Sequence, residues 1–224
     1  MSETLALHRT TIAKKAVMAV TGVILFGFVL VHMIGNLQIF AGTPEKINAY
    51  GAFLHSLGKV LWFARGVLLV SVVVHIASAV SLTRQNRAAR PQAYAMTKPR
   101  KSTYASRTMV WGGPIVLAFL VYHLMQFTIG GGGVAIEHDA QGRIDVYHNV
   151  IAGFSSVPVV VAYVVAQLAL GLHLQHGVWS MFNSLGVYRE DLEPAKRAAA
   201  GGFALLVVAG NLSIPLAVLF KVVT

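Results

Sequence analysis

The sequence contains no cysteine, and only 12% of its 224 residues are charged. The absence of cysteine excludes disulfide bonds, cysteine-ligated iron–sulfur clusters and covalent haem attachment through a C-x-x-C-H motif. A soluble domain normally carries about twice this charged fraction. Because 56% of the residues are also apolar, the composition indicates a membrane protein.

Charged side chains are missing altogether from five stretches. These stretches are 16–44, 66–83, 108–136, 146–188 and 198–220. Crossing the hydrocarbon core takes a helix of roughly 20 apolar residues, and a backbone without water must satisfy its own hydrogen bonds. All five are therefore predicted to span as helices. The longest could hold two spans only with a turn near its middle, and Pro158 alone is a poor candidate for that turn.

The predicted fold is an all-α integral membrane protein with a single membrane domain over residues 1–224. Four of its five transmembrane helices are expected to form a bundle around a bound group. The predicted helices cover about 15–39, 61–83, 108–129, 150–183 and 198–221. A short amphipathic helix is expected between the first two, around Ile47–Leu57.

The net charge of +10 is distributed unevenly. Of the 18 Lys and Arg residues, 13 lie in the N-terminal segment, in 84–107 and in 189–197, which are alternate loops of the predicted fold. This asymmetry places the N-terminus in the cytoplasm and the C-terminus outside. The basic excess is therefore a topology signal rather than a sign of nucleic-acid binding, with anionic lipid or an acidic partner as a second possibility.

Histidine is the notable polar residue within the spans: His32, His75, His123, His173 and His176. Ionisable side chains at this depth are rare and usually functional. At about 1.5 Å per residue, His32 and His123 lie roughly 26 and 24 Å from the inner boundary. By the same rule, His75 and His173 lie roughly 14 and 15 Å from it. The histidines therefore form two layers, each drawn from two helices.

Two opposed imidazoles at one depth are the ligand set of a six-coordinate haem iron, which favours electron transfer over oxygen chemistry. A flat macrocycle also needs small residues where it meets a helix. Candidates are Gly22, Gly27, Gly35, Ser71, Ser78, Gly112, Gly113, Gly171 and Gly177. Alternatives are histidines used only for packing, a proton relay, or zinc, which needs its ligands clustered at one depth. On geometry alone, His176 could replace His173, since the two share a helix face.

Two sequence blocks carry a resemblance to a known family. They are H-x-x-G-N-L, from His32, and H-x-x-x-G-V-W, from His173, with two further histidines between them. This combination resembles the cytochrome b subunit of succinate:quinone oxidoreductases, specifically the single-subunit, five-helix, two-haem type. Further matching segments, which extend the resemblance over most of the chain, are TIAKKAVMAVTG, INAYGAFLHSLG, VVVHIAS, LTRQNRAARP, STYASRTMVWGG and LVYHLMQF.

The resemblance implies two non-covalent b-type haems, each with two axial histidines. On this sequence, the implied ligands of the inner haem are His75 and His173, and those of the outer haem are His32 and His123. The H-x-x-x-G-V-W block selects His173 over His176, whose role near the site is left open.

The resemblance also implies a membrane anchor that carries electrons between an iron–sulfur subunit and membrane quinone, with menaquinone expected. A flavoprotein subunit and the iron–sulfur subunit would bind at the cytoplasmic face of a bacterial inner membrane, and the whole complex could form a higher oligomer. No succinate site is expected in this chain. Its spans lack the carboxylates that some relatives link to quinol oxidation, which favours succinate oxidation over fumarate reduction.

Several polar residues near the span ends are candidates for contacts with these groups. For haem propionates they are Arg65 and Lys59 at the outer side, and Arg84, Arg107 and Ser106 at the inner side. For a quinone carbonyl they are Ser102, Tyr104, Arg107 and Trp179. Topology anchoring, lipid contact and interfacial aromatic anchoring are the competing roles of these residues.

Two other function classes fit the sequence. One is the cytochrome b anchor of another respiratory enzyme, such as a hydrogenase or a formate dehydrogenase. The other is a haem-free anchor or small transporter.

Overall fold

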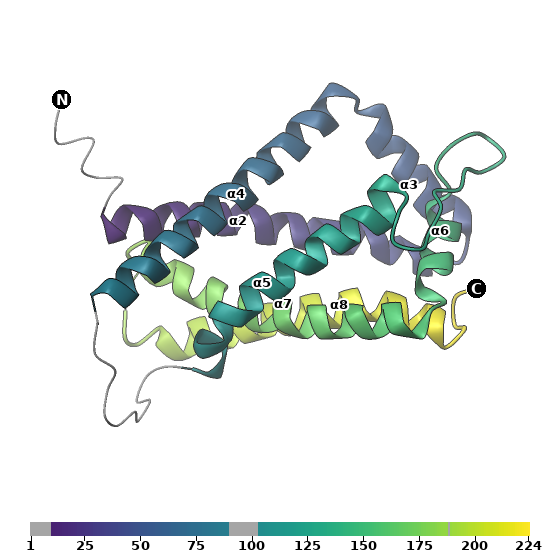
Figure 1. Cartoon of the computed structure of the whole chain (residues 1–224). Coiled ribbons are helices and arrows are strands. Elements are labelled where there is room, and N and C mark those ends of the chain that lie inside the picture. The colour runs from purple at the N-terminus through teal and green to yellow at the C-terminus, as the bar shows by residue number, and fades with distance from the viewer. Residues whose placement is uncertain (1–9, 90–102, 188) are drawn as a thin grey trace.

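The computed structural model describes residues 10–89, 103–187 and 189–224, and every named element in these ranges is helical. The elements are α2 (Thr11–Asn36), η1 (Leu37–Phe40), α3 (Pro44–Ser56), α4 (Lys59–Ala88), α5 (Tyr104–Leu124), η2 (Met125–Ile129), α6 (Val146–Phe154), α7 (Val157–Ser184) and α8 (Glu193–Leu219) (Figure 1). The helical segments that are long and apolar enough to cross a membrane are α2 with η1, α4, α5 with η2, α7 and α8. The prediction of an all-α protein with five such helices is confirmed, whereas the orientation of its termini stays a prediction.

The prediction of one helix over 150–183 is wrong. Helix α6 ends at Phe154, and α7 begins at Val157 after the extended residue Ser156, whose φ and ψ are −100° and 118°. Pro158 lies in the first turn of α7. Proline is well suited to that position, because the first N–H groups of a helix have no intrahelical acceptor. Pro158 therefore starts a helix after a break, and α6 is a separate short helix.

Each of the other long helices begins earlier than predicted, and α4 also ends later than predicted. Helix α4 continues to Ala88, past Arg84 and Arg87, because long basic side chains can lie along a helix with their charges at the interface. Helix α5 begins as early as Tyr104, where the side chain of Thr103 accepts a hydrogen bond from the backbone of Ser106. Charge-free stretches thus mark only the apolar part of each helix.

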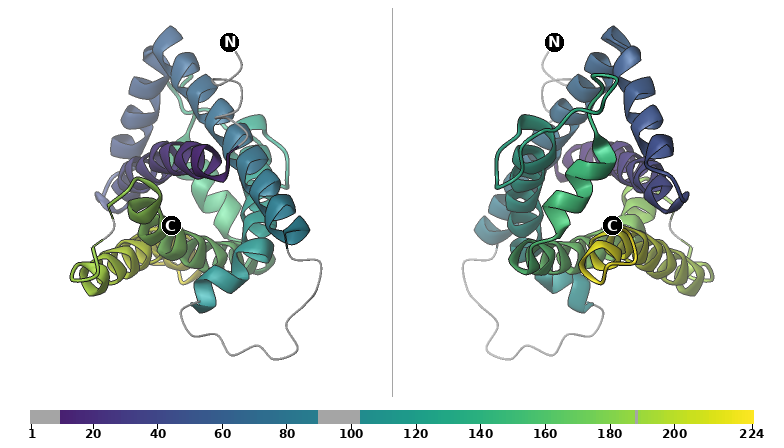
Figure 2. Two further views of the ribbon diagram at one scale, coloured as in Figure 1. Left: turned by 90° about the vertical axis from the view of Figure 1, so that its left-hand side faces the viewer. Right: turned by 90° about the vertical axis from the view of Figure 1, so that its right-hand side faces the viewer.

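Helix α2 lies at the centre of the molecule, between α4 on one side and α7 with α8 on the other (Figure 2). Helix α5 packs on α7, and α7 packs along α8. At the end of the bundle that is predicted to face the cytoplasm, called the inner end below, Lys14 Nζ donates to Ser81 Oγ over 2.8 Å and ties α2 to α4. The histidine-bearing helices are thus held by their neighbours, and α8, which has no histidine, supports α7.

The contact of α7 with α8 uses small and polar residues, as helix pairs in lipid commonly do. Asn211 Nδ2 donates to Gln167 Oε1 over 3.1 Å. A Cβ on Gly171 would lie 2.7 Å from Cγ2 of Val208, so glycine is needed for this close approach. The expectation that Gly171 lies against a bound group is therefore corrected, because it faces α8.

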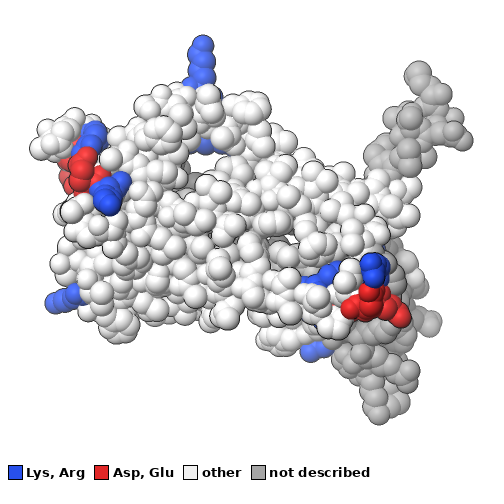
Figure 3. Space-filling view, turned by 180° about the vertical axis from the view of Figure 1, so that it is seen from behind, with Lys and Arg blue, Asp and Glu red and all other residues white. Residues whose placement is uncertain are grey.

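The end of the molecule that holds the C-terminus also carries α3, α6 and the 130–145 loop (Figure 1). Gly58, with φ at 52°, lies in the turn between α3 and α4 in a conformation that favours glycine. Arg143 joins the loop to α3 through Glu45, with nitrogen–oxygen distances of 2.9 and 2.8 Å. Between the charged groups, the surface has a broad area of uncharged atoms (Figure 3). Exposed Val, Leu and Phe side chains suit contact with lipid tails.

Candidate haem-binding site

The rings of His32 on α2 and His123 on α5 lie opposite each other within the bundle. Their centroids are 5.8 Å apart and their planes meet at 87°. His32 is exposed in spite of this position, so protein atoms leave open space beside its ring. Asn36 Nδ2 donates to His32 Nε2 over 3.1 Å and to the backbone oxygen of His32 over 2.9 Å, so the Nε2 lone pair of His32 is occupied by Asn36.

The second pair is His75 on α4 and His173 on α7. Their ring centroids are 6.2 Å apart and the planes meet at 52°. His173 Nδ1 is buried and has no hydrogen-bond partner among the described residues. A buried polar atom without a partner is uncommon and needs an explanation.

The two pairs lie at different levels of the bundle. Thr21 contacts His75 and therefore marks the inner level on α2, and Tyr163 contacts His123 and marks the outer level on α7. Along α2, the rise from Thr21 to His32 is about 16 Å, and along α7 the rise from Tyr163 to His173 is about 15 Å, at about 1.5 Å per residue. The distance between the levels of the two histidine pairs is thus similar whether it is counted along α2 or along α7.

This arrangement fits two bis-histidine metal centres. Two imidazoles that share a metal have centroids roughly 6 Å apart, given bonds of about 2.0 Å and about 1.1 Å from nitrogen to ring centre. The observed separations of 5.8 and 6.2 Å match this value. A Cβ added to Gly27, Gly113 or Gly177 would meet no atom within 4 Å, so open space lies beside each of these glycines.

The protonation of His75 follows from its partner Thr21. The Thr21 hydroxyl donates to the backbone oxygen of Val17 over 2.8 Å, and also lies 3.2 Å from that of Met18. Its oxygen lies 3.1 Å from His75 Nδ1. With its one proton donated to these carbonyl groups, which can only accept, Thr21 accepts from Nδ1–H of His75. The Nε2 of His75 is then free to act as a metal ligand.

Aromatic residues surround the outer pair much more closely than the inner pair. Phe28 stacks on His32 at 5.3 Å, and Phe119 and Phe127 lie 5.8 and 5.7 Å from His123. Tyr163 places its hydroxyl 2.9 Å from His123 Nδ1. These side chains restrict the orientation of the outer rings and reduce the polarity around them.

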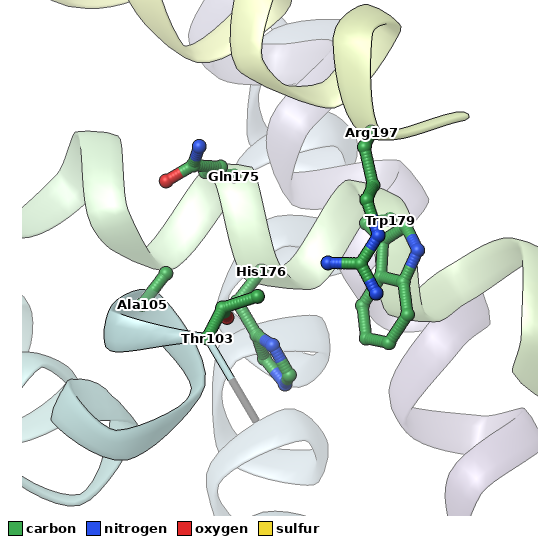
Figure 4. Close-up of a pocket in the computed structure, with 6 residues that line it drawn as sticks. All are labelled: Thr103, Ala105, Gln175, His176, Trp179 and Arg197. Atoms are coloured by element: carbon green, nitrogen blue, oxygen red, sulfur yellow. The ribbon is translucent and has the colours of Figure 1, made fainter. Parts of the chain in front are cut away.

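The ring of His75 lies opposite that of His173 and not that of His176. The His176 ring lies 5.9 Å from Trp179, and this histidine lines a pocket of about 120 Å³ at the inner end (Figure 4). The other lining residues are Thr103, Ala105, Gln175, Trp179 and Arg197. The choice of His173 as the ligand therefore agrees with the ring geometry, and its ligation stays a prediction.

The residues predicted to contact a quinone differ in the hydrogen bonding and exposure of their side chains. Trp179 Nε1 donates to Glu193 Oε1 over 2.7 Å, and Arg197 lies over its ring at 4.6 Å. Its indole N–H is thus already used within the protein. Tyr104 is 66% exposed and is available to a ligand or lipid. Ser102 lies outside the described residues.

The predicted propionate contacts lie near the two ends of the bundle. Arg65 stacks over Trp62 at 5.0 Å, and Lys59 is exposed at the start of α4. Arg84 and Arg107 are exposed near the inner end. Ser106 Oγ donates to the backbone oxygen of Thr103 over 2.8 Å. The hydroxyl of Ser106 is therefore committed to its own helix, and the roles of the four basic residues stay predictions.

Three polar residues that surround the histidines were not predicted from the sequence: Thr21, Gln126 and Tyr163. The residues singled out as haem ligands, or as small residues beside a haem, were histidine, glycine or serine, and these three are none of them. Gln126 is fully buried and lies three residues after His123, on the same helix face. An uncharged polar side chain at such a spacing was the signal available.

Comparisons with protein-family models, curated proteins and solved structures gave no match. Within the described ranges, no cluster of three or more His, Asp or Glu side chains could hold a metal ion. A bis-histidine haem needs only two protein ligands, so this observation does not bear on it.

Proposed function

We propose that this chain is a membrane electron-transfer subunit that holds two haems, each between histidines of two helices. The observation that carries the proposal is the presence of two opposed imidazole pairs, with centroids 5.8 and 6.2 Å apart, at two levels of an apolar helix bundle. Packing alone would not require four histidines in this arrangement.

When bound, haem would supply a one-electron couple, and ligation by two histidines would favour electron transfer over oxygen chemistry. His32 and His123 would hold the outer haem, and His75 and His173 the inner haem. Thr21 keeps the His75 proton on Nδ1, and the aromatic rings around His123 limit the access of water. The chain's own role is thus to position imidazoles and to keep their surroundings apolar.

The motifs at His32 and His173 support a more specific assignment within the proposal. On that basis, the chain is the anchor and cytochrome b subunit of a succinate:quinone oxidoreductase in a bacterial cytoplasmic membrane. A flavoprotein and an iron–sulfur subunit bind at the cytoplasmic face, and menaquinone is the expected quinone.

The test is to purify the chain after expression with its companion subunits and ample porphyrin. A pyridine haemochrome assay is expected to give two haems per chain, and a colourless preparation would refute the proposal. Covalent flavin in the purified complex and haem reduction by succinate are expected for the succinate:quinone assignment. Nickel or molybdenum in place of flavin would instead indicate a hydrogenase or formate dehydrogenase.

A further inference from the structure

A series of hydrogen bonds runs from the end of α6 to His123. Gln126 Nε2 donates to the backbone oxygen of Gly153 over 3.4 Å, and the Tyr163 hydroxyl donates to Gln126 Oε1 over 2.9 Å. The Tyr163 oxygen also lies 2.9 Å from His123 Nδ1. Gln126 and Tyr163 are 0% and 5% exposed, so bulk water does not compete for these groups.

The carbonyl group of Gly153 sets the direction of the series. A carbonyl can only accept, so the amide nitrogen of Gln126 faces it and the amide oxygen faces Tyr163. The phenol has a single proton and donates it to that oxygen. Tyr163 is therefore left to accept from His123, whose proton lies on Nδ1 and whose lone pair lies on Nε2.

The Gly153 carbonyl is available because α6 stops one residue later. The last four carbonyl groups of a helix have no intrahelical partner, and the break at Ser155 and Ser156 separates α6 from α7. A Cβ at position 153 would lie 2.7 Å from Phe127 and 3.1 Å from Gln126 Nε2, so glycine permits the approach. The helix break thus supplies the fixed acceptor for the series.

We propose that Gln126 and Tyr163 are positioning residues that hold His123 as the Nδ1–H tautomer, ready to bind iron through Nε2. Donation to Gln126 polarises the phenol and makes its oxygen a better acceptor. A hydrogen bond from the distal ring nitrogen fixes a ligating imidazole and raises its basicity. The use of the Nε2 lone pair rests on the proposed function, whereas the tautomer itself does not.

The two candidate sites therefore differ in the hydrogen bonds that orient their histidines. His123 is oriented by two buried side chains and a helix end, whereas the hydrogen-bond partners of His75 are Thr21 and the backbone of Met18, both on α2. His173 has no partner at Nδ1 among the described residues. The stronger acceptor at His123 is expected to hold the outer haem at a lower reduction potential than it would have without Tyr163.

The direct test is ¹⁵N NMR of histidine in the full chain, prepared without haem in lipid nanodiscs. The signal that His123→Gln removes identifies His123. Tyr163→Phe keeps the ring but removes the acceptor, so the ratio of Nδ1–H to Nε2–H is expected to fall roughly tenfold, the effect of one hydrogen bond. Gln126→Leu frees the phenol proton to be donated to Nδ1, so Nε2–H is expected to increase even further.

Tyr122→Phe is the matched control, since the Tyr122 ring lies 6.3 Å from that of Tyr163 and its hydroxyl makes no hydrogen bond within the described ranges. This variant is expected to leave the tautomer ratio unchanged. In the haem-loaded chain, Tyr163→Phe is expected to raise the midpoint potential of the haem that His123→Ala removes, and Tyr122→Phe to change neither haem. An unchanged tautomer ratio in both Tyr163→Phe and Gln126→Leu would overturn the inference, even if two haems bind. A wild-type chain that binds no haem would refute the proposed function. The tautomer measurement would still test the inference that Gln126 and Tyr163 hold His123 as the Nδ1–H tautomer.

Discussion

The Thr21 hydroxyl of α2 lies 3.1 Å from Nδ1 of His75 on α4, one helix away and 54 residues along the chain. Thr21 is 8% exposed, and its proton is directed to the carbonyl groups of its own helix. Threonine commonly makes this bond to a preceding turn. Here the bond leaves the hydroxyl oxygen as an acceptor at the level of the inner histidine pair.

Thr21→Val tests the role of that acceptor, because valine keeps the shape and removes the hydroxyl. Loss of a hydrogen bond to a metal-ligating histidine typically costs roughly 10–100-fold in affinity. We therefore expect the inner haem to pass to excess apomyoglobin faster by a factor of this order, with the outer haem unaffected. Thr21→Ser keeps a hydroxyl and is expected to behave like the wild type. Equal haem transfer from the valine and serine variants would contradict the assignment.

The amide pair Gln167 and Asn211 is expected to stabilise the contact of α7 with α8. Polar contacts of this kind between transmembrane helices contribute about 0.6–1.7 kcal/mol. Asn211→Leu is therefore expected to lower the free energy of unfolding by about this amount, measured by denaturation in mixed micelles. Haem content should not change, since α8 carries no histidine.

A double-mutant cycle separates the amide pair from general packing. Gln167→Leu with Asn211→Leu removes both members, so no buried amide is left without its partner. The double variant is expected to lose less stability than the sum of the two single variants. Strict additivity would show that the two side chains do not interact.

The contact between Arg143 and Glu45 predicts pH-dependent docking of the 130–145 loop on α3. The hydrogen bond from Arg143 lowers the pKa of Glu45 below its ordinary value of 4.5, and the neighbouring Asp139 opposes this effect. A carboxylate with a lowered pKa stabilises the folded state above its ordinary pKa, and this contribution is lost as the pH falls through the folded value. Amide hydrogen exchange in the loop, corrected for intrinsic rates, is therefore expected to increase below about pH 4.5.

Glu45→Gln is expected to weaken this dependence on acid and on salt, because screening acts on exposed charges. Asp139 also bonds to Arg143, at 2.7 Å, so part of the effect is expected to remain in the variant. Glu137→Gln in the same loop is the control, since only its backbone groups are bonded to Asn149. An identical pH profile for Glu45→Gln and the wild type would argue against the role of the ion pair.

The number of long helices and the layers of histidines followed from the sequence because lipid restricts a spanning backbone to a helix and tolerates few charges. Depth along a helix could then be counted from a basic or polar residue at the predicted inner boundary. Such counting placed His32 with His123 and His75 with His173, and these are the rings that lie opposite each other in the structure.

The break after Phe154 could not be predicted in the same way. Ser155 and Ser156 are uncharged, so they do not interrupt the charge-free stretch, and Pro158 is compatible with either a turn or a helix start. The partners of the histidines were missed for a related reason. Tyr163 and Thr21 lie 40 and 54 residues from the histidines they contact, so their roles depend on how the helices pack.

The central claim is that two specific pairs of imidazoles each hold one haem, and haem counting in paired histidine variants tests it most directly. His75→Ala combined with His173→Ala is expected to leave one haem per chain, as is His32→Ala combined with His123→Ala. His75→Ala combined with His123→Ala is expected to leave none. Retention of one haem by this last variant, or two different spectra from the single variants of one pair, would contradict the account.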